Sequence, residues 1–449
     1  MLSRLIFDET IPLERKAVVT RAHSTSWSDL RAQAQWIFET YGDVRAHRVG
    51  LSFRRNAESY AALAALDRMR RDVFLFDAQL TLEETLRLSK NLRLGAVLVP
   101  EGTGRSPKLQ VLELPDEERW SGGSSITILT SGSTGEPKAA RHSWEGLARP
   151  VRKGAGQFTP TWFLSYRPNL YAGLQVMLQC FADRGTLAVP DTEMDPSSIA
   201  QFMCATGVQF VSATPSYWRR LLMFSDAKVL KGIPLVQITL GGEVIDQPIL
   251  DKLRLCFPKV RLVHIYATTE LGRCFSVSDG MAGFPASYLN NLLPDGAELK
   301  VHEGELLVRS PNAMRMYDPY SSQQAPVTDW FATGDVVEIK GDRVYFVGRK
   351  SDMINVAGSK VYPVEVERVI RMIPGVSDVR IFGKTSSIAG ELVACEIVPE
   401  PDQDPASLRD AVNQACRAKL ASHQQPRLIK FVDRIDLSLA GKTLRSKTS

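Results

Sequence analysis

The chain has 449 residues, 44% of them hydrophobic, so it can bury a substantial core and is long enough for two or three domains. Its 55 basic and 50 acidic residues give a net charge of +5, a mild excess that suits anionic ligands and equally suits ordinary solubility. No apolar stretch approaches the ~18 residues that span a bilayer, no basic run carries interleaved aromatics, and the first residues lack a signal peptide's apolar segment, so we expect a cytoplasmic protein with no membrane span and no nucleic-acid partner.

The first two thirds of the chain alternate short apolar runs with helical patterns. The predicted elements are helices over 27–41 and 58–70, and strands over 47–53, 92–100, 208–213, 235–242 and 260–267. Such alternation is typical of mainly parallel sheets with helices, an α/β fold. Ligands of these sheets bind at the carboxyl ends of the strands.

The pattern changes near Glu298. Hairpin-like strands over 298–310 and 335–348 predict a β-rich subdomain, the second hairpin turning at Gly341-Asp342. A compact β-α-β-β-α-β-like stretch follows, with helices over 363–372 and 406–420 and strands over 376–383, 391–398 and 427–434. We therefore divide the chain into a large N-terminal domain, 1–349, and a small α+β C-terminal domain, 350–449.

The cysteine and histidine patterns give no metal motif. The six cysteines are scattered without a C-x-x-C pair, and the six histidines form no H-E-x-x-H cluster. We interpret the cysteines as reduced thiols that pack mostly as small hydrophobic side chains.

The segment ITILTSGSTGEPKAA, residues 126–140, carries the strongest chemical signal. An apolar strand runs into hydroxyl residues and glycines and then into Lys138. Hydroxyls donate hydrogen bonds to anionic oxygen, and glycines permit the close backbone approach that a phosphate-binding loop needs. The spacing is not that of a Walker A loop. A flexible Ser/Gly linker is the alternative, but a linker seldom follows a buried strand directly and ends in Pro-Lys.

Two further clusters end in carboxylates. HIYATTE, residues 264–270, offers Tyr266 for stacking on a base and Glu270 as an oxygen ligand for Mg²⁺, although both side chains could simply close a strand. Thr333-Gly334-Asp335 offers a carboxylate at a tight turn, which suits paired ribose hydroxyls but is also common turn chemistry. Near the end, residues 441–445 place Lys442 on a small-residue turn, where a frayed basic terminus is the default expectation.

Taken in order, TSGSTGEPKA, GGE, YATTE, TGD, GRKSDMINVAGSKVYPVEVE and AGKTLR resemble the motifs of the adenylate-forming superfamily. This superfamily includes acyl- and aryl-CoA synthetases, adenylation domains and luciferases. The likeness spans roughly Thr25 to Arg445. It implies that the enzyme uses ATP and Mg²⁺ to convert a carboxylic acid into an acyl-adenylate, releases pyrophosphate, and transfers the acyl group to the thiol of coenzyme A or of an acyl carrier protein.

The resemblance also implies roles for individual residues. The phosphate loop matches Thr130, Ser131, Gly132, Ser133, Thr134, Gly135 and Lys138. The strand end along the adenine matches Gly241, Gly242 and Glu243, and the stacking aromatic matches Tyr266. The α-phosphate contact matches Thr269, the magnesium ligand Glu270, the ribose pair Asp335 and Arg349, and the mobile catalytic lysine Lys442.

The resemblance places a hinge at Lys350-Ser351 of a mobile C-terminal domain, and it places Gly358 where the pantetheine arm approaches the backbone. Two positions depart from the family pattern. Ala267 stands where glycine is usual, and Ser351 where Asp or Lys is common. The region before the phosphate loop is shorter than in typical relatives, but no chemical group that the reaction needs is lost.

The acid substrate is less constrained. Residues 162–173 follow the phosphate loop and contain no Asp or Glu that could pair with an α-ammonium, which favours a simple acid. Trp162, Tyr166 and Tyr171 could line an aromatic acid pocket or could equally be core residues. Two alternatives stay open: a nucleotide-binding protein of this fold without ligase activity, and an oxidative enzyme of the luciferase type.

Overall fold

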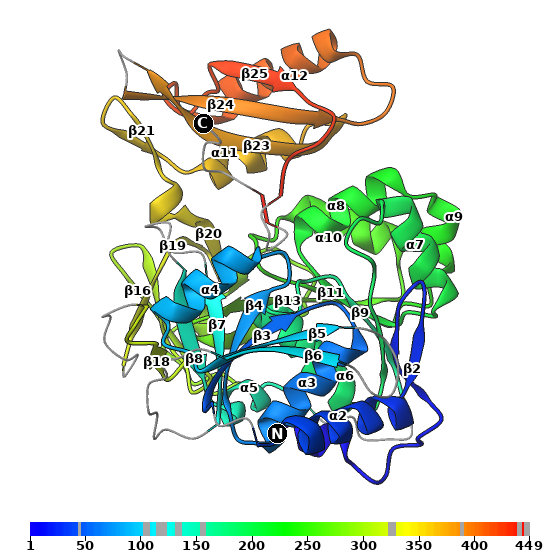
Figure 1. Ribbon diagram of the computed structural model, residues 1–449. Coiled ribbons are helices and arrows are strands. Elements are labelled where there is room, and N and C mark those ends of the chain that lie inside the picture. Colours follow the sequence, from blue (N-terminus) through cyan, green and yellow to red (C-terminus); the bar gives the residue numbers. More distant parts are fainter. Residues whose placement is uncertain are drawn as a thin grey trace.

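The computed structural model describes residues 1–43, 46–101, 108–113, 124–130, 137–152, 159–321, 329–386, 390–437 and 442–443. Figure 1 shows a large N-terminal domain and a smaller C-terminal domain lying above it in the view. The last segment of the chain runs from the small domain back toward the large one (Figure 1). Within the described residues, no helix is both long and apolar enough to cross a membrane.

The first sheet of the N-terminal domain has seven strands. Their order is β18 (Met316–Tyr317), β8 (Lys138–His142), β7 (Ser125–Thr130), β4 (Asp72–Asp77), β3 (Arg48–Phe53), β5 (Ala96–Glu101) and β6 (Lys108–Glu113). The four strands from β7 to β5 are parallel, and the strands at both edges are antiparallel to their neighbours. β5 begins four residues later than the sequence predicts, because Arg93 lies in the left-handed region, at φ +50°, and ends the preceding helix.

The second sheet has eight strands and carries the motifs of residues 241–243 and 266–270. Their order is β14 (Gly272–Val277), β13 (Arg261–Thr268), β12 (Gln237–Leu240), β11 (Phe210–Ala213), β9 (Thr161–Leu164), β10 (Thr186–Ala188), β1 (Lys16–Val19) and β2 (Ser24–Ser26). Every pairing from β13 to β1 is parallel. The prediction of mainly parallel sheets is confirmed.

Most of the helices that connect these strands begin at polar caps, whereas α6 follows Leu170 and has no side-chain cap. Asn56 caps α3 through the backbone N–H of Ser59, and Ser26 and Asp29 form a capping box that starts α2 at Trp27. The helices of this domain are α1 (Leu2–Ile6), α2 (Trp27–Tyr41), α3 (Ala57–Arg68), α4 (Leu82–Asn91), α5 (Trp144–Ala148), α6 (Tyr171–Ala182), α7 (Pro196–Ala205), α8 (Pro215–Phe224), α9 (Ala227–Gly232) and α10 (Gln247–Cys256).

The β-rich subdomain is a five-stranded sheet. Its order is β15 (Phe284–Pro285), β20 (Arg343–Arg349), β19 (Phe331–Lys340), β17 (Glu305–Arg309) and β16 (Glu298–His302), and a 3₁₀ turn, η1 (Ala286–Tyr288), follows β15. The predicted tight turn at Thr333-Gly334-Asp335 is wrong. These residues lie inside β19, where the φ of +74° at Gly334 is accommodated as an irregularity within the strand rather than as a chain reversal.

The C-terminal domain begins with a 3₁₀ turn, η2 (Lys350–Asp352). Its sheet contains β21 (Ile354–Val356), β22 (Ser359–Val361), β23 (Val376–Ser386), β24 (Gly390–Pro399) and β25 (Leu428–Phe431), with helices α11 (Pro363–Arg371) and α12 (Pro405–Lys419). The observed order is β-β-α-β-β-α-β, one strand more than the sequence predicts, because residues 354–361 fold into a hairpin. Its hydrophobic cluster is separate from those of the large domain.

Candidate active site

Three neighbouring strands of the second sheet end at one edge. β11, β12 and β13 are parallel, with Ala213 beside Leu240 and Leu240 beside His264, so β11 and β12 end together and β13 runs four residues further in the same direction, to Thr268. Gly241-Gly242-Glu243 follows β12, and Thr269-Glu270 follows β13. Two motifs that the sequence separates by more than twenty residues therefore meet at the strand ends, where a parallel sheet binds its ligands.

The predicted phosphate loop connects two antiparallel strands. Thr130 ends β7, Lys138 begins β8, and the two residues are paired. The Thr130 hydroxyl donates to the carbonyl oxygen of Lys138 at 3.3 Å. Ser131, Gly132, Ser133, Thr134 and Gly135 lie outside the described residues. The Lys138 ammonium lies 5.5 Å from the centre of the Tyr317 ring, a cation–π distance that holds it at the base of the loop.

The Glu270 carboxylate is held by a tyrosine from the other sheet. The Tyr317 hydroxyl donates to Oε1 of Glu270 at 3.1 Å. Burial, and then the negative charge of Glu270, raise the pKa of Tyr317, so its hydroxyl stays protonated and remains a donor. No cation of the described residues forms an ion pair with Glu270. A carboxylate fixed by a neutral donor keeps the oxygen lone pairs that a Mg²⁺ ligand needs.

The predicted ribose pair forms across β19 and β20. The Arg349 Nε donates to Oδ1 of Asp335 at 2.8 Å, and the two residues are opposite each other in the sheet. The Tyr266 hydroxyl donates to the other oxygen of Asp335 at 2.5 Å. Burial, followed by the charge of Asp335, raises the pKa of Tyr266 well above its ordinary value. The Tyr266 ring also stacks on Phe275 and Phe346, with centres 5.4 and 5.1 Å away, which fixes its plane.

The end of β12 receives the C-terminal segment. Oε1 of Glu243 accepts from the backbone N–H of Thr443 at 2.7 Å, and both carboxylate oxygens accept from Ser216 at 3.0 Å. Lys442 is consequently held against the glycines: a Cβ at Gly242 would lie 3.5 Å from its Cε. Gly242 has φ +85°, a conformation that other residues rarely adopt.

Lys442 faces several charged groups of the large domain. Loss of hydration, and then the positive charge of Arg349, lower the pKa of its ammonium, whereas the carboxylates of Glu243, Asp335 and Glu270 act in the opposite direction. By its solvent-accessible area the residue is nonetheless exposed. The structure therefore brings the lysine of the last motif together with residues of four earlier motifs.

The predicted hinge and thiol positions lie in the first turn and the first hairpin after β20. Lys350 and Ser351 form the η2 turn, and the Lys350 ammonium pairs with Glu305 at 2.6 Å. Gly358 has φ +87° in the two-residue turn between β21 and β22, and nothing lies within 4 Å of the place where its Cβ would be. The turn geometry accounts for the glycine, and its open surroundings leave room for a ligand.

The three aromatic candidates for an acid pocket are placed differently. Trp162 stacks on Phe210 at 4.8 Å, and its indole N–H donates to Asp183 at 3.2 Å, at the amino end of β9. It is a core residue, at the opposite end of the strands from the motifs. Tyr166 lies at the carboxyl end, and its hydroxyl donates to the carbonyl oxygen of Gly241 at 3.4 Å. The Tyr171 hydroxyl accepts from the backbone N–H of Arg273 at 3.1 Å.

Two residues of the site were not identified from the sequence. Tyr317 holds Glu270, and Ser216 holds Glu243, yet neither belongs to a motif. Ser216 does follow the strand-ending Ala213 by three residues, so its position at a carboxyl strand end is the one signal that could have indicated it. No local signal marks Tyr317.

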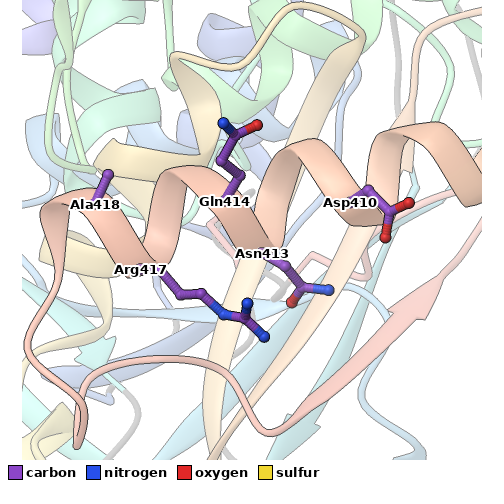
Figure 2. A pocket seen from close by; sticks show the side chains of 5 residues that line it. All are labelled: Asp410, Asn413, Gln414, Arg417 and Ala418. Atoms are coloured by element: carbon purple, nitrogen blue, oxygen red, sulfur yellow. The ribbon is translucent and has the colours of Figure 1, made fainter.

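A surface hollow also lies far from these residues. Its lining, Asp410, Asn413, Gln414, Arg417 and Ala418, comes from α12 alone (Figure 2). It contains none of the predicted site residues, and we assign it no role.

Sequence comparison agrees with this geometry. The AMP-binding enzyme family matches residues 121–318, and the AMP-binding enzyme C-terminal domain matches residues 365–442. The chain belongs to the adenylate-forming, AMP-binding enzymes. The first matched region contains Glu243 and Glu270 and the second contains Lys442, so residues of both regions lie in the site described above.

Relatives within this adenylate-forming family act on different acids. A 2-succinylbenzoate–CoA ligase of Listeria monocytogenes is 26% identical over 74% of this chain and 71% of its own. The long-chain-fatty-acid–CoA ligase FadD13 of Mycobacterium tuberculosis is 26% identical over 72% of this chain and 67% of its own. A benzoate CoA ligase of Burkholderia xenovorans, 16% identical, superposes with a TM-score of 0.81 over 98% of both chains, which shows the same fold.

Proposed function

We propose that this protein is an acid–thiol ligase that activates a carboxylic acid with ATP. In the first step a carboxylate oxygen attacks the α-phosphorus, the bond to the β-phosphate oxygen breaks, and pyrophosphate leaves. In the second step a thiol attacks the acyl carbonyl, AMP leaves, and the thiol proton passes to solvent. The observation that carries this proposal is the position of Lys442 beside Gly242, facing Glu270 and Asp335.

The first step joins two negatively charged reactants, so positive charge around the transferring group lowers its barrier. Lys138 at the start of β8 and Lys442 on the C-terminal segment would supply that charge. Asp335 and Arg349 would hold the ribose hydroxyls, and Thr269 would donate to the α-phosphate. Glu270 is suited to hold Mg²⁺, which when bound would neutralise part of the phosphate charge.

We propose a substrate acid without a required α-amino group. The segment from Trp162 to Gly173 carries no carboxylate, and burying an ammonium without a partner costs several kcal/mol. Tyr166, whose hydroxyl reaches Gly241, is the aromatic residue best placed to contact the acyl group. The benzoate and 2-succinylbenzoate named for two similar proteins favour an aromatic acid, and the fatty acid named for a third keeps aliphatic acids in the test panel.

The acceptor that we favour is coenzyme A, because the curated relatives reported above are named CoA ligases. A carrier-protein phosphopantetheine arm presents the same thiol and is the second acceptor to test. Gly358, in its open turn, is the proposed point of approach for either arm.

The decisive experiment is ATP–pyrophosphate exchange with a panel of aromatic acids, aliphatic acids and amino acids, repeated with coenzyme A and with a phosphopantetheinylated carrier protein. Exchange with simple acids, followed by thioester formation, supports the proposal. Exchange with proteinogenic amino acids alone contradicts the proposed substrate class. ATP binding without exchange for any acid would indicate a nucleotide-binding protein without ligase activity, and acid-dependent oxygen uptake would indicate a luciferase-type enzyme.

A further inference from the structure

A group of buried charges lies where the two domains meet. Arg371, at the end of α11 in the C-terminal domain, contacts Asp246 of the N-terminal domain at 3.4 Å. Within its own domain, the same guanidinium contacts Glu367 at 3.4 Å and Asp378 at 3.5 Å, and it donates to the carbonyl oxygen of Val379 at 3.0 Å. Its side chain is only 9% exposed.

Asp246 is shared between the domains. The Arg219 guanidinium, from α8 of the same domain, donates to Oδ2 of Asp246 at 2.7 Å, and Arg371 approaches the same oxygen. Oδ1 accepts from the backbone N–H of Ile249 and so caps α10. Although burial acts to raise it, the two arginines hold the pKa of Asp246 below its ordinary value, so the carboxylate is charged.

The loop between β12 and α10 therefore holds the small domain at two points. Glu243 accepts from Thr443, next to Lys442, and Asp246, three residues later, contacts Arg371. Both contacts depend on one orientation of the C-terminal domain. An exposed pair between the Lys252 ammonium and Glu400, 2.9 Å apart, spans the same junction.

We propose that Asp246 and Arg371 are positioning residues: their interdomain pair holds the C-terminal domain in the orientation that places Lys442 beside Gly242. This inference rests on the proposed function, in which Lys442 acts in the first step, and on the mobile C-terminal domain that the resemblance implies, which would rotate about Lys350-Ser351 before the second step. Rotation separates Arg371 from Asp246. The strength of this pair therefore sets the relative populations of the two domain orientations, one for each half-reaction.

The test neutralises the shared carboxylate. Asp246→Asn removes the charge, and its side-chain oxygen can still accept from Ile249 at the start of α10. The adenylation rate is proportional to the population of one domain orientation, and the thioester rate to the population of the other. The ratio of the two rates therefore changes by the same factor as the equilibrium constant between the orientations, whichever orientation predominates in the wild-type protein. We expect thioester formation relative to adenylation to rise about tenfold, because weakening a buried, hydrogen-bonded ion pair commonly costs at least that factor.

The two rates are measured separately, adenylation by pyrophosphate exchange and thioester formation from the preformed acyl-adenylate. Asp295→Asn is the matched control. Asp295 pairs with Arg273 at 2.8 Å and is 10% exposed, close to the 6% of Asp246, but its pair lies within the N-terminal domain. We expect this control to leave the ratio unchanged.

A second readout needs no activity. A carbodiimide couples an ammonium to a carboxylate in direct contact, so the wild-type protein should yield a cross-linked peptide joining Lys252 and Glu400. We expect Asp246→Asn to lower the rate of this cross-link and Asp295→Asn to leave it unchanged. Lys252→Arg keeps the charge but cannot form the amide, and it identifies the correct product.

The outcomes separate the two proposals. A lower cross-link rate in Asp246→Asn supports the positioning role even if no acid supports exchange, a result that would overturn only the proposed function. An unchanged cross-link rate together with an unchanged ratio overturns the positioning role. If Asp246→Asn lowers the melting temperature enough to impair folding, Arg371→Lys replaces it: this variant keeps a positive charge near Glu367 but shortens the reach to Asp246, and a ratio unchanged in it overturns the inference.

Discussion

Replacing Tyr317 with Phe tests whether the residue that holds Glu270 serves the reaction. The substitution removes one hydroxyl that donates to Oε1 of Glu270 at 3.1 Å and leaves the ring beneath the Lys138 ammonium. The hydroxyl is the one donor to this carboxylate among the described residues. Without it, the carboxylate can rotate away from the position in which it would bind Mg²⁺ beside the phosphates.

The expected magnitude follows from the contact. A hydrogen bond to a charged group at a half-buried site contributes about 1–2 kcal/mol. If that free energy is lost from the transition state, adenylation slows about five- to thirty-fold. We also expect a higher Mg²⁺ concentration at half-maximal rate, because the metal must now order its own ligand.

The assay is pyrophosphate exchange over a series of Mg²⁺ concentrations. Tyr288→Phe is the matched control, since it removes a hydroxyl that donates to a neutral carbonyl oxygen, that of Ser276, at 3.2 Å outside the site. Wild-type exchange and wild-type Mg²⁺ dependence in Tyr317→Phe would refute the reasoning and reduce the contact to a structural one.

Substitutions at three further positions test the proposed catalytic lysine, hinge and thiol approach. Lys442→Ala should slow exchange on the order of 10²–10³-fold with ATP binding nearly intact; near-normal exchange would make Lys442 a terminal surface lysine. Because the Lys442 pKa is lowered and its charged form is the active one, wild-type exchange should fall as pH rises at a lower pH than for an ordinary lysine, and Lys442→Arg should lack this fall. Ser351→Pro should keep exchange and lose most thioester formation, because proline fixes φ near −65° and so holds the described orientation. Ser351→Ala, the control, should keep both half-reactions. Wild-type rates of both half-reactions in Ser351→Pro would place the pivot elsewhere. Gly358→Ala, which puts a side chain at φ +87°, should slow thioester formation alone, and an unchanged rate would remove Gly358 from the thiol path.

The parts of the fold that follow from local chemistry were predictable. β-branched runs predicted β11, β12 and β13, and the helical pattern over 27–41 predicted α2 with the bounds that the structure shows. The motifs then placed Gly241 and Glu270 at strand ends. The resemblance, rather than spacing, supplied their roles. The turn expected at Gly334 was wrong because a positive-φ glycine fits a strand irregularity as well as a chain reversal.

Contacts between distant residues could not be predicted. Tyr317 and Glu270 are 47 residues apart, Asp246 and Arg371 are 125 apart, and Glu243 and Thr443 are 200 apart. Each depends on the register of separate sheets or on the orientation of a whole domain. For the same reason Trp162 could not be distinguished from a pocket residue, since its neighbour Phe210 lies on another strand.

The chain passes from the proposed ribose-binding pair to the proposed hinge across a single peptide bond. Arg349, which holds Asp335, is followed directly by Lys350. In a cycle with two domain orientations, a ribose that hydrogen-bonds to Arg349 would alter the conformation of Lys350, the first residue of the proposed hinge. Thermodynamic linkage makes this effect reciprocal, so the orientation of the small domain must in turn change the affinity for nucleotide. ATP, acyl-adenylate and AMP would then be held with different strengths before and after rotation, and the release of AMP becomes part of the same movement that admits the thiol.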